Sequence, residues 1–435
     1  MFKLYLKQAW QLIKQNKLFS TVYIICTGLA IALTMTLAIV YYVKIAPQYP
    51  EGNRNRTLVI KYMGVSFGKN RNNSYKVGYP MLRDYLYTLQ TPETVSGSFP
   101  LEDTNDQIEH PESGKNIPVS VRAVDPPFWE VFTYRFLNGK PFSQEEFDSG
   151  IRSAVISSSL AQNLFGTENA EGRRFKLNAD EYRISGVVRS SSYAAPDSYA
   201  DVFIPYTLYP GELSMNSSFR DGMLGPMDVY FVAPSVGEIN KVKNEVNDIF
   251  RKISSSQDEF TISPFDYPEP YWQHILRVNP ITGFDWLEFM KTFGVVLLAL
   301  LIIPALNLAG MVSSRMEKRL PEMGIRKAFG ASKGTLYRQI LTENFLLTML
   351  GGLVGLILSY IIILTSSGWI LTLFDKWPDS GAFGSTVTIT PSMLFNPWVF
   401  VITFLVCFIL NFVSAITPAA NGLKKNIIYS LNEKS

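Results

Sequence analysis

Residues 18–43 read LFSTVYIICTGLAIALTMTLAIVYYV and contain no charged side chain, while Lys17 and Lys44 stand at the two ends. At 1.5 Å per residue a helix over this run would be about 39 Å long, enough to cross a hydrocarbon core of ~30 Å with some tilt. Further uncharged runs cover residues 292–314, 344–374 and 398–417. A soluble core could hold one such run, but four of them predict a multi-pass α-helical membrane protein with four transmembrane helices.

The first run could instead be a cleaved signal peptide. It is longer than the apolar region of about 7–15 residues that signal peptides contain. The residues that follow it, KIAP at 44–47, show no small-residue cleavage site. An uncleaved span is therefore predicted.

Basic residues near the spans predict the orientation, because cytoplasmic flanks are enriched in Lys and Arg. Residues 1–17 carry only basic charges, residues 315–340 have a basic excess, and Lys424 and Lys425 follow the last span, whereas residues 44–291 contain more acidic than basic residues. Both termini are therefore predicted to be cytoplasmic, with the large acidic segment outside. The apolar spacing within residues 5–13 favours an interfacial amphipathic helix, and a simple basic orientation signal is the alternative.

The segment between the first two spans has the pattern of a mixed α+β domain, long enough for two lobes. Ser235 and Glu238 have the spacing of a capping box. Residues 190–198, SSSYAAPDS, predict a mobile surface loop, with plain linkage favoured over a ligand contact. Strands are predicted at residues 56–63, 93–99, 117–124, 154–157, 173–177, 182–188, 202–205, 228–232 and 259–264, and helices at 79–89 and 236–253.

Composition and motifs exclude several function classes. The net charge of +3 does not favour a nucleic-acid partner, and two Cys and two His make a Cys/His metal site improbable. The nearest match to a phosphate-binding loop, GVSFGKN at residues 64–70, is one residue short and lacks the hydroxyl. No acidic pair stands in a special apolar setting, and the span centres hold no ionisable residue. We therefore predict no catalytic, cofactor-binding or metal-binding residue, and an energy source on another chain.

Two stretches resemble a known permease family. Residues 315–332, RMEKRLPEMGIRKAFGAS, and residues 335–346, TLYRQILTENFL, resemble the FtsX-like permease domain of MacB-type ABC systems. The outer segment is similar to the MacB-like periplasmic core, through DPPFW at 125–129, LNGKPF at 137–142, AVIS at 154–157, LAQNLFG at 160–166 and YRISGVV at 182–188.

The resemblance implies a permease subunit that is not itself an enzyme and that couples ATP hydrolysis by a separate ATPase subunit to movement of its periplasmic domain, in the export or extraction of a periplasmic or membrane substrate. It implies the bacterial inner membrane as the location and no cofactor in this chain, because ATP would bind to the partner. A second permease copy or a sibling permease would complete a homo- or heterodimer, and a periplasmic adaptor is a further candidate partner.

The resulting layout combines the spans with the resemblance. We expect a cytoplasmic amphipathic helix at 1–17, transmembrane helix 1 at 18–43, a MacB-like periplasmic core at 44–283, a stalk and transmembrane helix 2 at 284–314, a cytoplasmic coupling-helix loop at 315–340, transmembrane helix 3 at 341–366, a periplasmic loop at 367–396, transmembrane helix 4 at 397–418 and a cytoplasmic tail at 419–435.

The cytoplasmic loop has the pattern of a short helix that starts at Pro321 and ends at Gly330, with Ser332 capping the next helix. Glu322 would stand near its positive N-terminal end. In the light of the resemblance this is a coupling helix, with an apolar face for a groove on the ATPase and basic side chains that pair with acids around it. The face comprises Ile325, Ala328 and Phe329, and the basic side chains are Arg326 and Lys327. The alternative is that these basic residues only enforce the orientation.

Small residues and a proline mark the spans. Gly351, Gly352 and Gly355 permit close helix contact, either within one subunit or at a dimer seam. Pro304 predicts a kink in the second span, which is either a hinge or a packing feature. A rival function to the permease is a membrane-anchored sensor or scaffold whose periplasmic domain binds a partner and which works without an ATPase.

Overall fold

The computed structural model describes the chain except for residues 1–6, 8–9, 12, 16, 68–70, 102–105, 193–194, 212, 214–222, 257–259, 278, 280–281, 373–395 and 425–435. The chain divides into a helical unit (Met1–Tyr42, Met290–Ile370 and Thr390–Ser435) and a second unit (Val43–Phe289 and Leu371–Ile389) that contains the sheets. Each unit is described by itself below.

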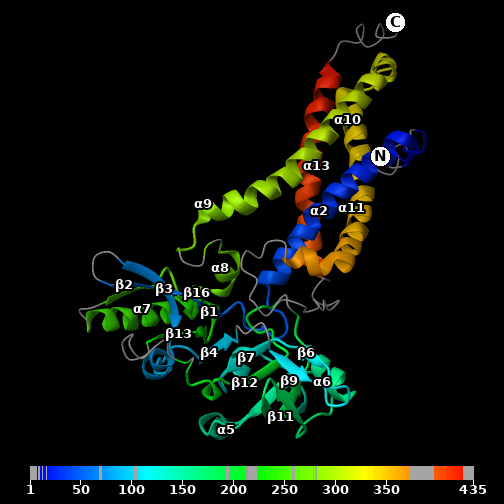
Figure 1. Ribbon diagram of the computed structural model, residues 1–435. Helices are drawn as coiled ribbons and strands as arrows, with labels where there is room; N and C mark the ends of the chain where they lie inside the picture. The colour runs from blue at the N-terminus through cyan, green and yellow to red at the C-terminus, as the bar shows by residue number, and fades with distance from the viewer. Residues whose placement is uncertain are drawn as a thin grey trace. The chain divides into compact units, whose positions relative to one another are not determined.

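Four long helices make up the helical unit: α2 (Lys17–Ile45), α10 (Val295–Ala328), α11 (Lys333–Thr372) and α13 (Pro397–Lys424) (Figure 1). They lie at the four predicted span positions. Within the described part of the chain, Lys17–Ile45 and Lys333–Ser366 are long and apolar enough to cross a membrane, and the apolar helix Pro397–Leu410 is shorter. Two candidate spans are therefore supported, and the number of four stays a prediction.

The helix ends differ from the predicted segment bounds. Trp286 begins a helical stretch, α9 (Trp286–Phe289) and a π-helical turn (Met290–Gly294), that leads into α10, as the predicted stalk requires. The helix α11 has a kink at Ser366, the predicted end of the third span, and reaches Thr372. The predicted periplasmic loop and cytoplasmic tail fall largely outside the described residues, and the predicted N-terminal helix does so in part.

The prediction of a separate helix starting at Pro321 is wrong. The helix α10 runs without interruption from Val295 to Ala328, so Pro321 lies inside it. Tertiary packing outweighs the local effect of proline here, because Met316 and Met323 on either side are buried in one apolar cluster with Leu336 and Ile340 of α11. The residues of the predicted coupling helix therefore lie at the end of a long helix.

A long mixed sheet organises the second unit. In spatial order its strands are β16 (Glu269–Pro270), β1 (Thr57–Ile60), β14 (Asp228–Val232), β4 (Thr94–Pro100), β7 (Val121–Val124), β12 (Val202–Pro205), β9 (Ser153–Ser157), β11 (Asp180–Val188), β10 (Arg174–Leu177), β5 (Gln107–Glu109) and β6 (Asn116–Pro118), with β8 (Phe136–Gly139) also paired to β11. The pairs β7–β12 and β9–β11 are parallel.

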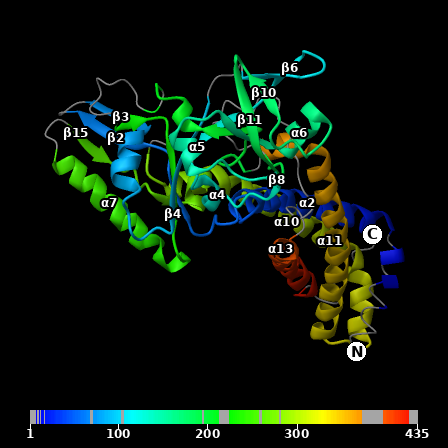
Figure 2. The same ribbon diagram turned by 90° about the horizontal axis from the view of Figure 1, so that it is seen from below.

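A second, four-stranded sheet joins β13 (Leu224–Gly225), β3 (Arg71–Val77), β2 (Met63–Phe67) and β15 (Phe260–Ser263). The amphipathic helix α7 (Ile239–Ser255) packs against β15, and Figure 2 shows the two side by side. Shorter helical segments are α3 (Tyr79–Met81), followed by a π-helical turn (Leu82–Leu86), α4 (Phe128–Val131), α5 (Gln144–Asp148), α6 (Ser158–Phe165) and α8 (Tyr271–Leu276), with 3-10 turns at Tyr206–Leu208 and Val236–Glu238. This confirms the predicted α+β class.

Two hydrophobic cores share the long sheet, where the sequence predicted two lobes. Along β12 they take alternate residues: Phe203 belongs to one core, and Val202 and Ile204 belong to the other. Successive side chains of a strand point to opposite faces, so both faces of the sheet are covered here. The described part of this domain is therefore continuous across its sheet rather than split into separate lobes.

Three local predictions need correction. The predicted strands 56–63 and 117–124 are each interrupted, giving β1 and β2 in one case and β6 and β7 in the other. Ser235 makes no capping bond to the backbone, because its hydroxyl turns to the Glu238 carboxylate, which Lys241 also binds at 2.9 Å. The capping box lies instead at Ser143 and Glu146 of α5.

Candidate functional site

The C-terminal end of α10 is closed by the backbone. Gly330 has φ +90°, a conformation that L side chains rarely adopt, and the Ala331 N–H donates to the Arg326 carbonyl over 2.9 Å. This bond between residues five apart in the sequence is typical of a Schellman motif, in which a glycine in the left-handed conformation ends the helix. Ser332 then caps α11 by accepting a hydrogen bond from the Thr335 N–H at 3.2 Å. The predicted roles of Gly330 and Ser332 at the helix ends match this geometry.

This helical hairpin presents an apolar tip. Phe329 is 88% exposed, Ile325 is 50% exposed, and Ala328 is also exposed. The three predicted coupling residues thus share the end of α10. The turn that follows them is closed by the Gly330 motif on one side and by the Ser332 cap on the other.

Of the two predicted basic residues, Arg326 has side-chain partners within the chain. The Arg326 guanidinium donates to Glu322 at 2.6 Å and to Gln339 of α11 at 2.8 Å. Arg326 therefore connects α10 to α11 within the chain, with Glu322 as its ion-pair partner, and its pairing with an acid of the ATPase stays a prediction. Lys327 lies in the last turn of α10, and its side chain is outside the described ones.

The three glycines of α11 face other helices of the same chain. A Cβ on Gly351 would lie 2.9 Å from Thr27 Cβ of α2, and one on Gly355 would lie 2.8 Å from the Gly28 carbonyl oxygen. A Cβ on Gly352 would lie 2.2 Å from the Phe404 ring of α13. Packing within the subunit therefore accounts for these residues. The helix α10 continues through Pro304, whose side chain is not described.

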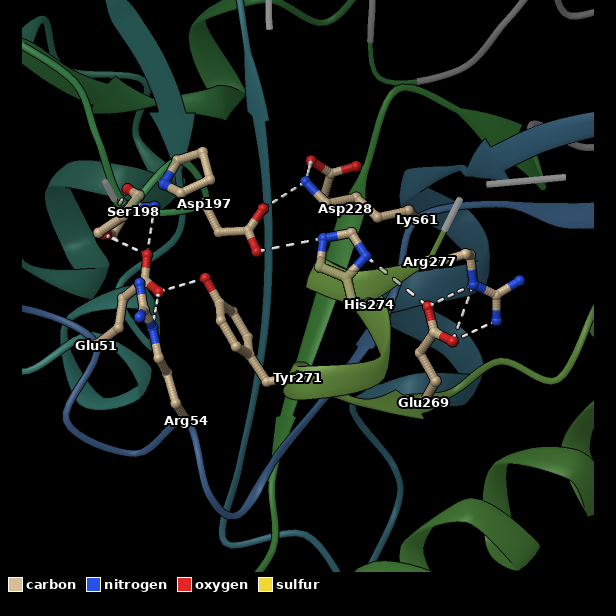
Figure 3. A network of polar contacts seen from close by, with 12 residues as sticks. Glu51, Arg54, Lys61, Asp197, Ser198, Asp228, Glu269, Tyr271, His274 and Arg277 are labelled. Carbon is tan, nitrogen blue, oxygen red and sulfur yellow. Dashed lines mark hydrogen bonds and ion pairs between the residues drawn. The ribbon is translucent and has the colours of Figure 1, made fainter. Parts of the chain in front are cut away.

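A second polar constellation lies in the sheet unit, and the sequence analysis missed it. We call it the buried charge network (Figure 3). It comprises Glu51, Arg54, Lys61, Lys76, Asp197, Ser198, Asp228, Glu269, Tyr271, His274 and Arg277. Its four lysine and arginine side chains balance its four carboxylates.

Glu51 connects three parts of this network. Its carboxylate accepts hydrogen bonds from Arg54 Nε at 2.7 Å, from the Ser198 hydroxyl at 2.6 Å and from the Tyr271 hydroxyl. Arg54 in turn donates to the carbonyls of residues 43, 44 and 46 at the end of α2. Glu51 and Arg54 are 2% and 3% exposed, so these hydrogen bonds form inside the protein.

Lys61 lies at the centre of the network. Its ammonium binds Asp197 at 2.6 Å and Asp228 at 2.7 Å, and Lys76 binds Asp228 at 3.0 Å. Burial alone would raise the pKa of Asp197, but Lys61 and His274 hold that pKa well below its usual range. The pKa of Asp228 is likewise lowered, against the effect of its burial, by Lys61 and Lys76. Both carboxylates are therefore charged at neutral pH.

The third part surrounds α8. His274 lies between two carboxylates, with Nε2 3.5 Å from Asp197 and Nδ1 3.8 Å from Glu269. Arg277 donates through Nε to both Glu269 oxygens, at 2.9 and 3.0 Å. Burial raises the pKa of Glu269, and the hydrogen bonds from Arg277 counteract this rise. Arg277 thus holds the C-terminal end of α8 to β16 of the long sheet, and Tyr271 at the other end of α8 bonds Glu51.

Two sequence predictions failed at this network. The described residues of the segment 190–198 do not form a plain surface loop, because Asp197 and Ser198 are 1% and 0% exposed. Acidic residues are in fact buried with basic partners, and for Asp197 and Asp228 the partner Lys61 lies far away in the sequence. Among the described residues, no group of three or more His, Cys, Asp or Glu could hold a metal ion.

Comparisons with known families cover nearly the whole chain. The family model of the MacB-like periplasmic core domain matches residues 21–249, and that of the FtsX-like permease C-terminal domain matches residues 294–427. The chain belongs to the MacB/FtsX family of ABC transporter permeases. The loop and core motifs that suggested this resemblance lie inside the two matched ranges.

Two curated relatives illustrate the membership. The ABC transporter permease YknZ of Bacillus subtilis is 22% identical over 55% of this chain and 56% of its own length. The macrolide export ATP-binding/permease protein MacB of Pasteurella multocida is 21% identical over 82% of this chain and 48% of its own length. The chain thus spans about half the length of these relatives.

Two solved structures match part of the chain. The extracellular domain of YknZ from Gram-positive bacteria covers 46% of this chain with a TM-score of 0.33 and 13% identity, and 98% of that domain is matched. The periplasmic region of MacB from Actinobacillus actinomycetemcomitans covers 47% of this chain with a TM-score of 0.31 and 13% identity, and 88% of that region is matched.

Proposed function

We propose that this permease couples ATP hydrolysis by a separate ATPase subunit to conformational change in its periplasmic domain. The observation that carries the proposal is the exposed apolar tip of the α10–α11 hairpin. Phe329 is 88% exposed in the turn between α10 and α11, where Gly330 ends α10 and Ser332 caps α11. A rigid aromatic side chain of this kind suits a pocket on a partner protein, where aromatic anchors contribute most of the binding energy.

The physical requirement for coupling is differential binding. The ATPase can shift the permease between conformations only if its nucleotide-bound and nucleotide-free states bind the hairpin with different affinity. The hairpin is suited to this task because Arg326 ties α10 to Gln339 of α11. A push on the tip would then move both helices together.

The proposal includes a cellular setting, which the family membership supports. We place the protein in the bacterial inner membrane, with both termini cytoplasmic and the sheet domain in the periplasm. It would pair with a second copy or a sibling permease, and a periplasmic adaptor is a further candidate partner. The work would consist of exporting or extracting a periplasmic or membrane substrate, and no nucleic acid would take part.

The test is recovery of the ATPase with the native complex. Phe329→Asp places a charge in the proposed pocket and should reduce ATPase co-purification at least about tenfold, since one buried anchor contributes 2 kcal/mol or more. Phe329→Leu is the matched control, because it keeps an apolar anchor and should retain most of the recovery. Membrane fractionation of both variants checks insertion.

Unchanged ATPase recovery with Phe329→Asp would show that the hairpin tip does not bind the ATPase. If the wild-type protein recovers no ATPase at all, the membrane-anchored sensor or scaffold becomes the better description. In that case a periplasmic protein, rather than an ATPase, should be retained by the immobilised chain.

A further inference from the structure

The buried charge network includes residues from two connections between helices and the sheet unit. The first connection follows α2, and the second precedes α9. Arg54 donates to the carbonyls of Val43 at 2.8 Å, Lys44 at 3.0 Å and Ala46 at 2.9 Å. These carbonyls lack intrahelical donors because they belong to the last turn of α2 or follow it, and a cation is favourable there.

The second connection is held in a similar way. Arg277, directly after α8, donates to the carbonyl of Phe265 at 3.2 Å and to that of Thr282, which lies on the way to α9. The same guanidinium binds Glu269 of β16, and β16 pairs with β1 of the long sheet. Arg277 thus joins the segment that leads to α9 directly to the sheet.

Glu51 links the two connections to each other. One carboxylate accepts from Arg54 of the first connection, from Tyr271 of α8 and from Ser198 of the loop that precedes β12 (Figure 3). His274 of α8 adds a contact to Asp197 in that loop at 3.5 Å. Both connections and the middle of the sheet therefore meet in one set of directional bonds.

Stability alone does not account for such a network. Replacing a buried ion pair by apolar side chains of similar volume is often neutral or stabilising, whereas removing one partner leaves a buried charge uncompensated. Balanced buried charges therefore resist small displacements and fix one geometry. Packed regions of this kind do not deform gradually, so they can pass on a displacement as one body.

We propose that the buried charge network is a rigid joint that transmits movement from the two helix connections to the periplasmic sheet, with Arg54 and Glu51 as its positioning residues. This inference rests on the proposed function, because it needs an ATP-driven movement to transmit. It adds the residues through which that movement would reach the sheet.

The experiment measures the movement in the purified complex with its ATPase. Spin labels are attached to Trp398→Cys on α13 and Glu181→Cys on β11, both exposed positions, after the native Cys26 and Cys407 are replaced by serine. Because α13 lies outside the two connections, the distance between the labels reports how far the sheet moves relative to this helix. Pulsed electron paramagnetic resonance then gives the distance distribution without nucleotide and with trapped ATP. The wild-type complex should show a nucleotide-dependent shift.

Arg54→Lys keeps the charge but loses the planar fork that serves Glu51 and the carbonyls together, so the shift should fall to less than about half of the wild-type value. Arg152→Lys is the matched control, because Arg152 pairs with Asp180 at 2.9 Å at an exposed site. It should leave the shift unchanged. ATPase recovery should be equal in all three proteins.

Tyr271→Phe, which removes one hydrogen bond to Glu51 and keeps the ring, covers the case that Arg54→Lys does not fold. It should also reduce the shift. If either folded variant shows the same distance shift as the wild type, the network does not transmit the movement, and the proposed function is unaffected. No shift in the wild-type complex would overturn the proposed function, and the joint with it.

Discussion

Asp197 keeps its charge in the protein interior through its cationic neighbours. Burial alone would raise its pKa, but Lys61 and His274 lower the pKa well below its usual range. A carboxyl whose pKa in the folded state lies below its unfolded value of about 3.9 stabilises the fold at any pH above that value. This contribution is lost as the pH falls through the folded-state pKa.

Asp197→Asn should therefore be less stable than the wild type at neutral pH, by about 3–5 kcal/mol for a broken buried pair. The difference in unfolding free energy should narrow as the pH falls below about 4. Asp197 of the unfolded wild type then takes up a proton, and the stabilisation from its charge in the folded state is progressively lost. Urea unfolding of the detergent-solubilised protein from pH 7 to pH 3 measures this. Asp180→Asn, at the exposed pair with Arg152, is the control. A constant difference at all pH values would contradict the role assigned to the charge.

At the scale of an element, α11 depends on glycine at two different kinds of contact. A Cβ on Gly355 would meet the backbone oxygen of Gly28 at 2.8 Å, and one on Gly352 would meet the Phe404 ring at 2.2 Å. A backbone oxygen can move only with its helix, whereas a ring can be removed by mutation. The two positions therefore differ in whether a second mutation can restore packing.

Gly355→Ala and Gly352→Ala should each destabilise the helical unit by about 1–3 kcal/mol through overpacking. Phe404→Ala should restore part of the loss in Gly352→Ala and none in Gly355→Ala, and a double-mutant cycle of thermal unfolding in detergent measures both. Gly310→Ala in α10, where nothing lies within 4 Å of the added Cβ, should not destabilise. If Gly355→Ala is as stable as the wild type, close packing within the subunit is contradicted, and a dimer seam becomes the better interpretation of this glycine.

At the scale of the whole molecule, the proposed function requires the hairpin tip and the sheet domain on opposite sides of the membrane. In a protein without native cysteines, Phe329→Cys should react with a membrane-impermeant maleimide only after the inner membrane is opened. Glu181→Cys should react once the outer membrane alone is permeabilised. Both positions are exposed, so burial does not limit the reaction. Labelling of both residues from the same side would contradict the proposal that the hairpin tip and the sheet domain lie on opposite sides of the membrane.

Local patterns were sufficient for much of the fold. The strands at 202–205 and 228–232 lie at their predicted positions as β12 and β14, because β-branched and aromatic residues between turn signals favour an extended chain. The helix predicted at 236–253 is likewise present as a 3-10 turn and α7, because its apolar residues recur on one helical face. The helix ends at Gly330 and Ser332 have equally local causes.

The sequence by itself thus determined the long apolar helices, the α+β domain and the hairpin tip, since each depends on the spacing of nearby residues. Only the tertiary structure decided the buried charge network. Lys61 meets Asp228 because β1 and β14 pair antiparallel with Ile60 opposite Val229. Asp197 completes the pair from a loop that reads as surface linkage. Sheet register and long-range packing select these partners, and neither leaves a signal in local periodicity.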